Sequence, residues 1–78
     1  MEGRVYSEIL RRVEKRRRAN VIPDHTTLLD LRRWAFREGI PEDTLLRSLS
    51  ELRKTGRIQV GRTLNDWWIR PVEDNEAK

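Results

Sequence analysis

Cysteine is absent from this chain of 78 residues, and histidine occurs once, at His25. The absence of cysteine excludes disulfide bonds, thiolate metal ligands and a cysteine nucleophile, and it is typical of a reducing compartment. One histidine without cysteine cannot form the common nitrogen and sulfur zinc sites within a single chain. Because His25 lies just before a predicted helix, we expect it to be solvated or to cap that helix. No metal or other cofactor is expected.

Glycine is scarce as well, with four residues scattered at positions 3, 39, 56 and 61. This scatter excludes a glycine-rich phosphate loop. Carboxylates are numerous, but each is predicted in a helix cap, on a helix face or in the polar tail, so no acid–base pair is predicted. The sequence therefore favours neither an enzyme nor a small-molecule substrate.

Long apolar runs are also missing. No stretch approaches the roughly 18 apolar residues of a membrane span, and the N-terminus lacks the apolar region of a signal peptide. We therefore expect no membrane contact and a cytoplasmic location, associated with the nucleoid if the source is bacterial, archaeal or viral. A chain of this length has one small core. We predict a single domain over residues 1–72 and a frayed polar tail at residues 73–78.

Basic residues exceed acidic residues by 17 to 13, and the excess is unevenly distributed. Residues 1–20 hold seven basic and three acidic side chains, residues 21–56 hold six of each, and residues 57–70 hold three basic and one acidic. The first segment includes the run Arg16, Arg17 and Arg18. This run is either a solvated last helical turn, where cations are favoured, or a patch that contacts phosphates.

The first predicted helix has one apolar face. That face comprises Val5, Tyr6, Ile9, Leu10 and Val13. The side chains expected to point away from it are Glu8, Arg11 and Glu14. After this helix, Val21 and Ile22 are candidates for a very short strand, and Pro23 forbids a longer one.

The second predicted helix runs to about Glu38 and has an unusually wide apolar arc. Its N-cap is supplied by Asp24, Thr26 or Thr27. The central stripe comprises Leu28, Leu31 and Ala35, flanked by Leu29 and Phe36 on one side and by Trp34 on the other. Either neighbouring helices cover both flanks, or part of the arc belongs to a partner interface.

Residues 39–56 predict a turn followed by a third helix. Gly39 suits a left-handed helix C-cap, and Pro41 has a φ compatible with a helix start. Leucines then recur at i, i+4 and i+7, which predicts a core-facing stripe of Leu45, Leu49 and Leu52. Gly56 is expected to end this helix.

Alternating residues after position 56 predict a hairpin with strands at residues 57–61 and 66–70. Ile58 and Val60 are expected to face the core. In the returning strand, Trp67 and Ile69 share one face, and Trp68 lies on the other, so we expect Trp68 to be the more exposed tryptophan.

This spacing resembles the winged helix-turn-helix superfamily, in which a glycine and an apolar residue lead into a recognition helix that ends in glycine before a hairpin called the wing. The matching positions are Gly39, Ile40, Thr44, Leu45, Arg47, Leu49, Leu52, Gly56 and Ile58. The resemblance covers roughly residues 5 to 72. It implies an α+β fold of three helices and a C-terminal hairpin, in the order helix, short strand, helix, helix, strand, strand.

The resemblance also implies a small DNA-binding protein, either a transcriptional regulator or a replication or recombination accessory factor. Its third helix would lie in the major groove of double-stranded DNA, with the wing touching the duplex. The implied contacts are Glu42, Asp43, Thr44, Leu46 and Arg47 at the bases, Ser50 and Lys54 nearer the backbone, and Arg62 on the wing. Arg47 suits a guanine contact because its planar fork binds O6 and N7 together.

The alternative is a protein-interaction or dimerisation module without sequence-specific DNA binding. Its expected interface comprises Trp34, Leu46, Leu64 and Trp68. A homodimer on a two-fold DNA site would combine both functions. A shared face for Arg47, Lys54, Arg62 and residues 16–18 would favour DNA, whereas an exposed patch of Trp34, Phe36 or Trp68 would favour a protein partner.

Overall fold

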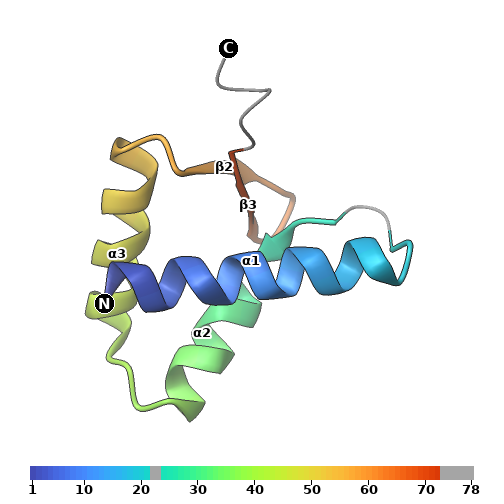
Figure 1. Ribbon diagram of the computed structural model, residues 1–78. Helices are drawn as coiled ribbons and strands as arrows, with labels where there is room; N and C mark the ends of the chain where they lie inside the picture. The colour runs from blue at the N-terminus through green and yellow to red at the C-terminus, as the bar shows by residue number, and fades with distance from the viewer. Residues whose placement is uncertain (22–23, 73–78) are drawn as a thin grey trace.

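The computed structural model describes residues 1–21 and 24–72, which form three helices and a three-stranded antiparallel sheet (Figure 1). In chain order the elements are α1 (Glu2–Arg18), β1 (Thr26–Thr27), α2 (Leu28–Arg37), α3 (Glu42–Lys54), β2 (Ile58–Arg62) and β3 (Trp67–Pro71). The predicted α+β class and element order are confirmed. The expected tail at residues 73–78 lies outside the described residues. Within those residues, no helix has the length and apolar character needed to cross a bilayer.

The last strand, β3, is the central strand of the sheet and separates β1 from β2. Ile69 of β3 lies opposite Thr26 of β1 on one side and opposite Val60 of β2 on the other. Both hairpin strands are shifted by one residue from the predicted ranges. The prediction of a short strand at Val21 and Ile22 is wrong, because the strand is β1, five residues later; Ile22 itself lies outside the described residues.

Val21 is unavailable to the sheet because it takes part in ending α1. Its N–H donates to the Arg16 carbonyl at 2.9 Å, and the N–H of Asn20 donates to the Arg17 carbonyl at 3.1 Å. Asn20 has a positive φ of 56°, so these bonds form the Schellman motif that commonly ends a helix. Helix α1 therefore continues past Val13, the last residue of its apolar face, and the chain turns before β1 begins.

Helix α2 ends in the same way, and this ending sets the position of α3. Gly39 has a φ of +72°, which an L-residue with a Cβ adopts only with strain, and the N–H of Ile40 donates to the Ala35 carbonyl at 2.8 Å. Ile40 then turns into the core, and Pro41 is the N-cap of α3. At the other end of α2, Thr27 is the N-cap, and its hydroxyl accepts from the Asp30 N–H at 3.2 Å. The predicted turn and cap are confirmed.

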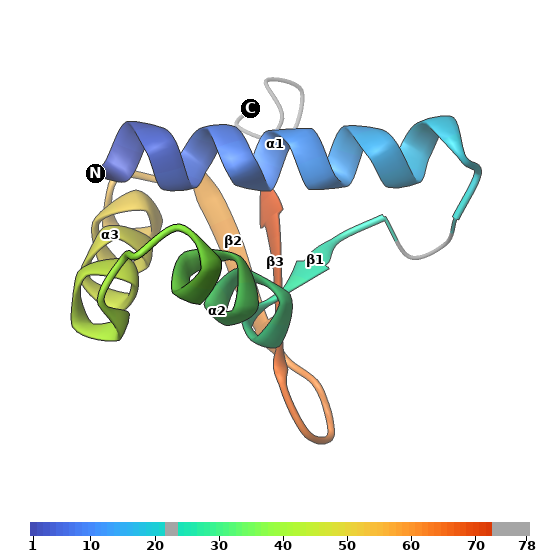
Figure 2. The same ribbon diagram turned by 90° about the horizontal axis from the view of Figure 1, so that it is seen from below.

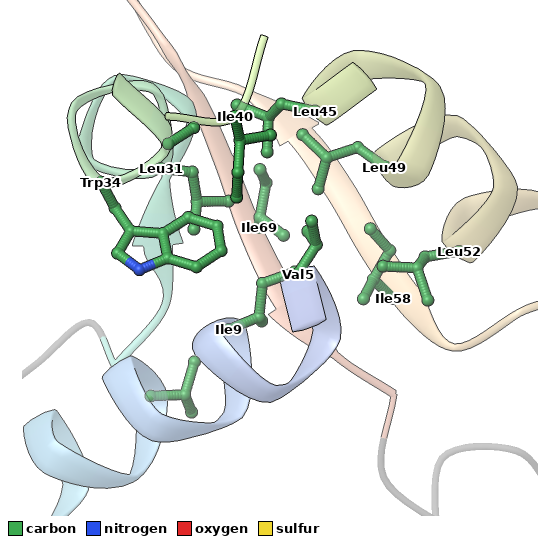
Figure 3. Packing of buried hydrophobic residues seen from close by; sticks show 12 residues of the cluster. Val5, Ile9, Leu31, Trp34, Ile40, Leu45, Leu49, Leu52, Ile58 and Ile69 are labelled. Carbon is green, nitrogen blue, oxygen red and sulfur yellow. The ribbon is translucent and has the colours of Figure 1, made fainter. Parts of the chain in front are cut away.

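The core lies where the three helices meet one face of the sheet. Helix α1 crosses one end of the molecule, and the turn of the β2–β3 hairpin extends away from it, past α2 (Figure 2). Figure 3 shows the side chains of all three helices converging on Ile58 and Ile69 of the hairpin. The buried hydrophobic side chains are Val5, Ile9, Val13, Leu31, Trp34, Ala35, Ile40, Leu45, Leu49, Leu52, Ile58 and Ile69.

Glu8 was expected to point away from the apolar face of α1, and this prediction is wrong. Only 7% of the residue is exposed. Arg11 donates two hydrogen bonds to its carboxylate, at 2.9 and 2.7 Å, and Arg12 donates a third at 2.6 Å. These guanidinium groups satisfy the charge that burial would otherwise penalise. The hydrogen bonds from Arg11, together with Arg12 and against the opposing effect of burial, lower the pKa of Glu8 from its ordinary value.

The lowered pKa of Glu8 predicts acid sensitivity. A carboxylate whose pKa is depressed by folding stabilises the protein above its unfolded pKa, and this contribution is lost as the pH falls through the folded pKa. We expect Glu8→Gln to lower the free energy of unfolding by about 1–2 kcal/mol near neutral pH. The difference from the parent should shrink below about pH 4. Urea denaturation followed by circular dichroism at several pH values measures both effects.

Glu14→Gln is the matched control, because Glu14 forms an exposed pair with Arg18 on the same helix. Such pairs contribute about 0–1 kcal/mol, so this change should be nearly neutral. A loss from Glu8→Gln that does not vary with pH would contradict the assigned role of the ionised carboxylate.

Candidate nucleic-acid interface

The outer face of α3 is exposed because the leucine stripe holds the opposite face in the core. Three of the predicted contacts, Arg47, Ser50 and Lys54, lie on this exposed face. Thr44 is half-buried. It precedes Arg47 by three residues, so it borders the same exposed face, on the side away from Leu46.

A groove runs between α3 and the β2–β3 hairpin, with a volume of about 280 Å³. From α3 it is lined by Leu46, Ser50 and Arg53, and from the hairpin by Val60 and Trp67. Two of these residues, Leu46 and Ser50, were predicted contacts. Arg53 and Trp67 were not, although Arg53 follows Ser50 by three residues and Leu46 by seven, a spacing that places it on the same side of a helix.

The two tryptophans have the opposite exposure to the one predicted. Trp67 is exposed, and the guanidinium of Arg62 lies 5.6 Å from its ring centroid. Trp68 is half-buried, covers Gly61 and lies with its ring centroid 5.9 Å from that of His25. Trp67 does share the core-facing side with Ile69, but it occupies the end of the strand beyond the core, so its ring forms the margin of the groove.

The turn of the hairpin is held by hydrogen bonds among its own residues. The N–H of Thr63 donates to the Asp66 carbonyl at 2.8 Å, and the N–H of Asp66 donates to the Thr63 hydroxyl at 2.9 Å. The Asp66 carboxylate also accepts from the Trp67 N–H at 2.7 Å. Leu64, which is 95% exposed, therefore projects from an ordered turn.

The charge on this surface is positive. Within residues 1–21 and 24–72, Arg47, Arg53 and Arg62 form no ion pair, while Lys54 lies 3.8 Å from Glu51 in a weak exposed pair. The acidic start of α3 is compensated in part. Glu42 accepts from Arg32 at 2.5 Å, and the Asp43 carboxylate accepts from the Thr44 N–H at 3.0 Å.

The basic run of α1 is not part of this surface. Arg16, Arg17 and Arg18 lie at the end of α1 remote from α3 (Figure 1). Arg17 pairs with Asp24 at 2.6 Å, and the hydrogen bond from Arg17 lowers the pKa of that carboxylate. Arg18 pairs with Glu14 at 2.7 Å, and Arg16 lies 3.8 Å from Asp30. The run therefore does not share a face with α3 and the hairpin, because the length of α1 separates them, and the condition that would have favoured DNA is not met by these three arginines.

The residues predicted for a protein interface are only partly exposed in the structure. Trp34 is buried, with the guanidinium of Arg4 lying 5.9 Å from its ring centroid, so it belongs to the core. Leu46 and Leu64 are exposed as expected. On the second helix, one flank is covered and the other is not, because Leu29 and Phe36 remain exposed.

Comparisons of the chain with protein-family models, with curated proteins and with solved structures gave no match.

Proposed function

We propose that the chain is a winged helix-turn-helix domain that binds double-stranded DNA through the outer face of α3 and the β2–β3 hairpin. One observation carries the proposal: three arginines of the α3–hairpin side have no carboxylate partner among the described residues. Arg53 lines the groove, Arg62 lies over Trp67 at its margin, and Arg47 is on the exposed outer face of α3. Unpaired cations converging on an exposed helix are the electrostatic feature expected of a phosphate-binding surface.

The parts of this surface suit different parts of a duplex. An α-helix fits the major groove, where Arg47 would reach base edges and its fork would favour guanine. Arg53 and Lys54 would contact the phosphates beside α3, and Arg62 those beside the hairpin. Leu46 and Trp67 supply apolar area against sugars or a thymine methyl group. In this scheme phosphate contacts give most of the affinity, and Arg47 gives most of the sequence preference.

The DNA proposal predicts salt-sensitive binding that depends on three arginines. We expect a mixed-sequence duplex of about 20 base pairs to bind with an affinity that falls with salt at a slope of about −3 on logarithmic axes. Arg47→Ala, Arg53→Ala and Arg62→Ala should each weaken binding by about 5–10-fold or more. Replacing a phosphate contact should also reduce the slope by about 1. Fluorescence anisotropy at several salt concentrations measures both quantities.

Arg18→Ala is the matched control, because it removes the same charge from an exposed side chain at the far end of α1. Screening over that separation should leave the affinity within about twofold of the parent. If Arg18→Ala loses as much duplex affinity as the three test variants, the assignment of the binding surface is wrong. No binding at low salt would instead favour the alternative module, with Leu46 and Leu64 contacting a protein.

A further inference from the structure

A second exposed surface lies on α2 and the start of α3, and the proposed DNA contact does not use it. Phe36 is 85% exposed and Leu29 is 46% exposed on the same flank of α2. With Ile40 and Leu45 they line a groove of about 540 Å³, the α2 groove. Its lining is mainly apolar, and Arg32 at its edge also lines a depression beside the hairpin, together with Arg62 and Trp67.

The exposure of Phe36 is costly for a domain with so small a core. Burying a phenylalanine side chain is strongly favourable relative to leaving it in water. On the opposite flank of α2 the large aromatic side chain is covered, because Trp34 is buried there with Arg4 over its ring. The Phe36 flank has no such cover among the described residues, although it carries the larger exposed hydrophobic area. Burial by a binding partner would recover this stabilisation.

The charges around the α2 groove indicate the chemistry of that partner. Arg33 and Arg37 border it, and within the described ranges 1–21 and 24–72 neither forms an ion pair. Arg37 also lines a neighbouring depression with Arg11, Arg12, Lys15 and Arg16 of α1. Arg11 and Arg12 pair with Glu8, and Arg16 lies 3.8 Å from Asp30, so their charges are largely balanced. Among the described residues, the cations that border the apolar groove without a carboxylate partner are thus Arg33 and Arg37, and a ligand that filled the groove would be favoured by carboxylates at its edges.

Other occupants match these features less well. A second copy of this chain would bring two positive surfaces together, because a two-fold contact places Arg33 and Arg37 against the same patch on the partner. Like charges brought together in this way oppose association. A DNA backbone would satisfy the arginines but would leave the apolar groove uncovered. An acidic peptide with a large apolar side chain satisfies both.

We propose that the α2 groove binds an acidic amphipathic helix of a protein partner. The apolar face of that helix packs against Leu29 and Phe36, and its carboxylates pair with Arg33 and Arg37. This is the helix-in-groove mode, in which anchors spaced one turn apart enter an apolar groove. The domain then carries two adjoining surfaces with different ligands, a partner helix on α2 and a duplex on α3 and the hairpin.

The probe for this proposal is a synthetic helical peptide of about 15 residues, with Leu and Phe at i, i+4 and i+7 and Glu at most other positions. Titration into the 15N-labelled full chain should shift the amide signals of residues 29–37, 40 and 42–45. Phe36→Ser and the double variant Arg33→Glu/Arg37→Glu should each weaken the peptide at least about tenfold. A peptide with Lys in place of Glu should bind at least about tenfold more weakly than the acidic one.

Leu64→Ser is the matched control, because Leu64 is an equally exposed apolar side chain on the hairpin turn. It should leave peptide affinity unchanged. The proposal is overturned if the acidic peptide causes no shifts at millimolar concentration, or if the shifts fall on α3 and the hairpin. It is also overturned if sedimentation shows a dimer that Phe36→Ser dissociates, or if Arg33→Glu/Arg37→Glu abolishes duplex binding while peptide binding persists.

Discussion

Leu45→Ala is expected to lower the free energy of unfolding by about 3–4 kcal/mol, the largest effect of any change considered for this chain. Leu45 is 0% exposed at the start of α3, where it packs with Leu49 and Ile40 in the core (Figure 3). Removing its branched end leaves a cavity that the surrounding helices fill only in part. Domains of this size have a total stability of roughly 4–12 kcal/mol, so the variant should be close to unfolding. Urea denaturation followed by far-UV circular dichroism measures the loss.

Leu46→Ala provides the comparison, because the next residue along α3 is 44% exposed. We expect it to cost less than about 1 kcal/mol in stability. It should also weaken duplex binding modestly if Leu46 lies against DNA. Equal losses of stability in the two variants would mean that α3 presents a different face to solvent, and the assignment of Arg47 and Ser50 to the interface would fail with it.

Gly61→Ala is expected to lower the free energy of unfolding by about 1–3 kcal/mol. A Cβ added at Gly61 would lie only 2.1 Å from atoms of the Trp68 indole, so the ring must move. Moving it disrupts its contact with His25, and the strain falls on the register between β2 and β3. Urea denaturation measures the loss, and the indole N–H signals of the variant report whether Trp68 has been displaced.

Gly3→Ala is the control, because a Cβ at Gly3 meets no atom within 4 Å and the residue lies in α1. This change should be neutral or stabilising by up to about 1 kcal/mol. In Gly61→Ala combined with Trp68→Leu, the cost of adding the Cβ should be smaller than in the parent, since the obstructing ring is gone. If Gly61→Ala costs as much stability in the Trp68→Leu background as in the parent, the close approach of the Trp68 ring is not the cause of the loss.

The helices were predictable because their signals are local. The leucine stripe of α3 and the glycine at the end of α2 follow from spacing and backbone conformation alone. Strand β1 is different, because two threonines show no periodicity in the sequence. They form a strand only because they pair with β3, where Thr26 lies opposite Ile69. Glu8 was missed because its burial depends on the hydrogen bonds donated by Arg11 and Arg12. A charged residue on a helix is otherwise expected in solvent.

The candidate site was predictable only along α3. Helical spacing correctly placed Arg47 and Ser50 on one exposed face, and it contained the signal for Arg53. Alternation assigned the two tryptophans to opposite sides of β3, but it gave no information on how far the core extends along the strand, which decides their exposure. Nor does a run of arginines reveal whether nearby carboxylates will pair with it, as Asp24 does with Arg17.

The central position of β3 makes the order of synthesis matter for folding. Thr26 pairs with Ile69, so β1 has no sheet partner until nearly the whole domain has been translated. Helices can form as the chain emerges from the ribosome, whereas the sheet must close a long loop after residue 71 has cleared the exit tunnel. Until then, the apolar faces of the helices lack the strand that they cover in the native structure. Folding of the domain is therefore completed only after β3 has emerged.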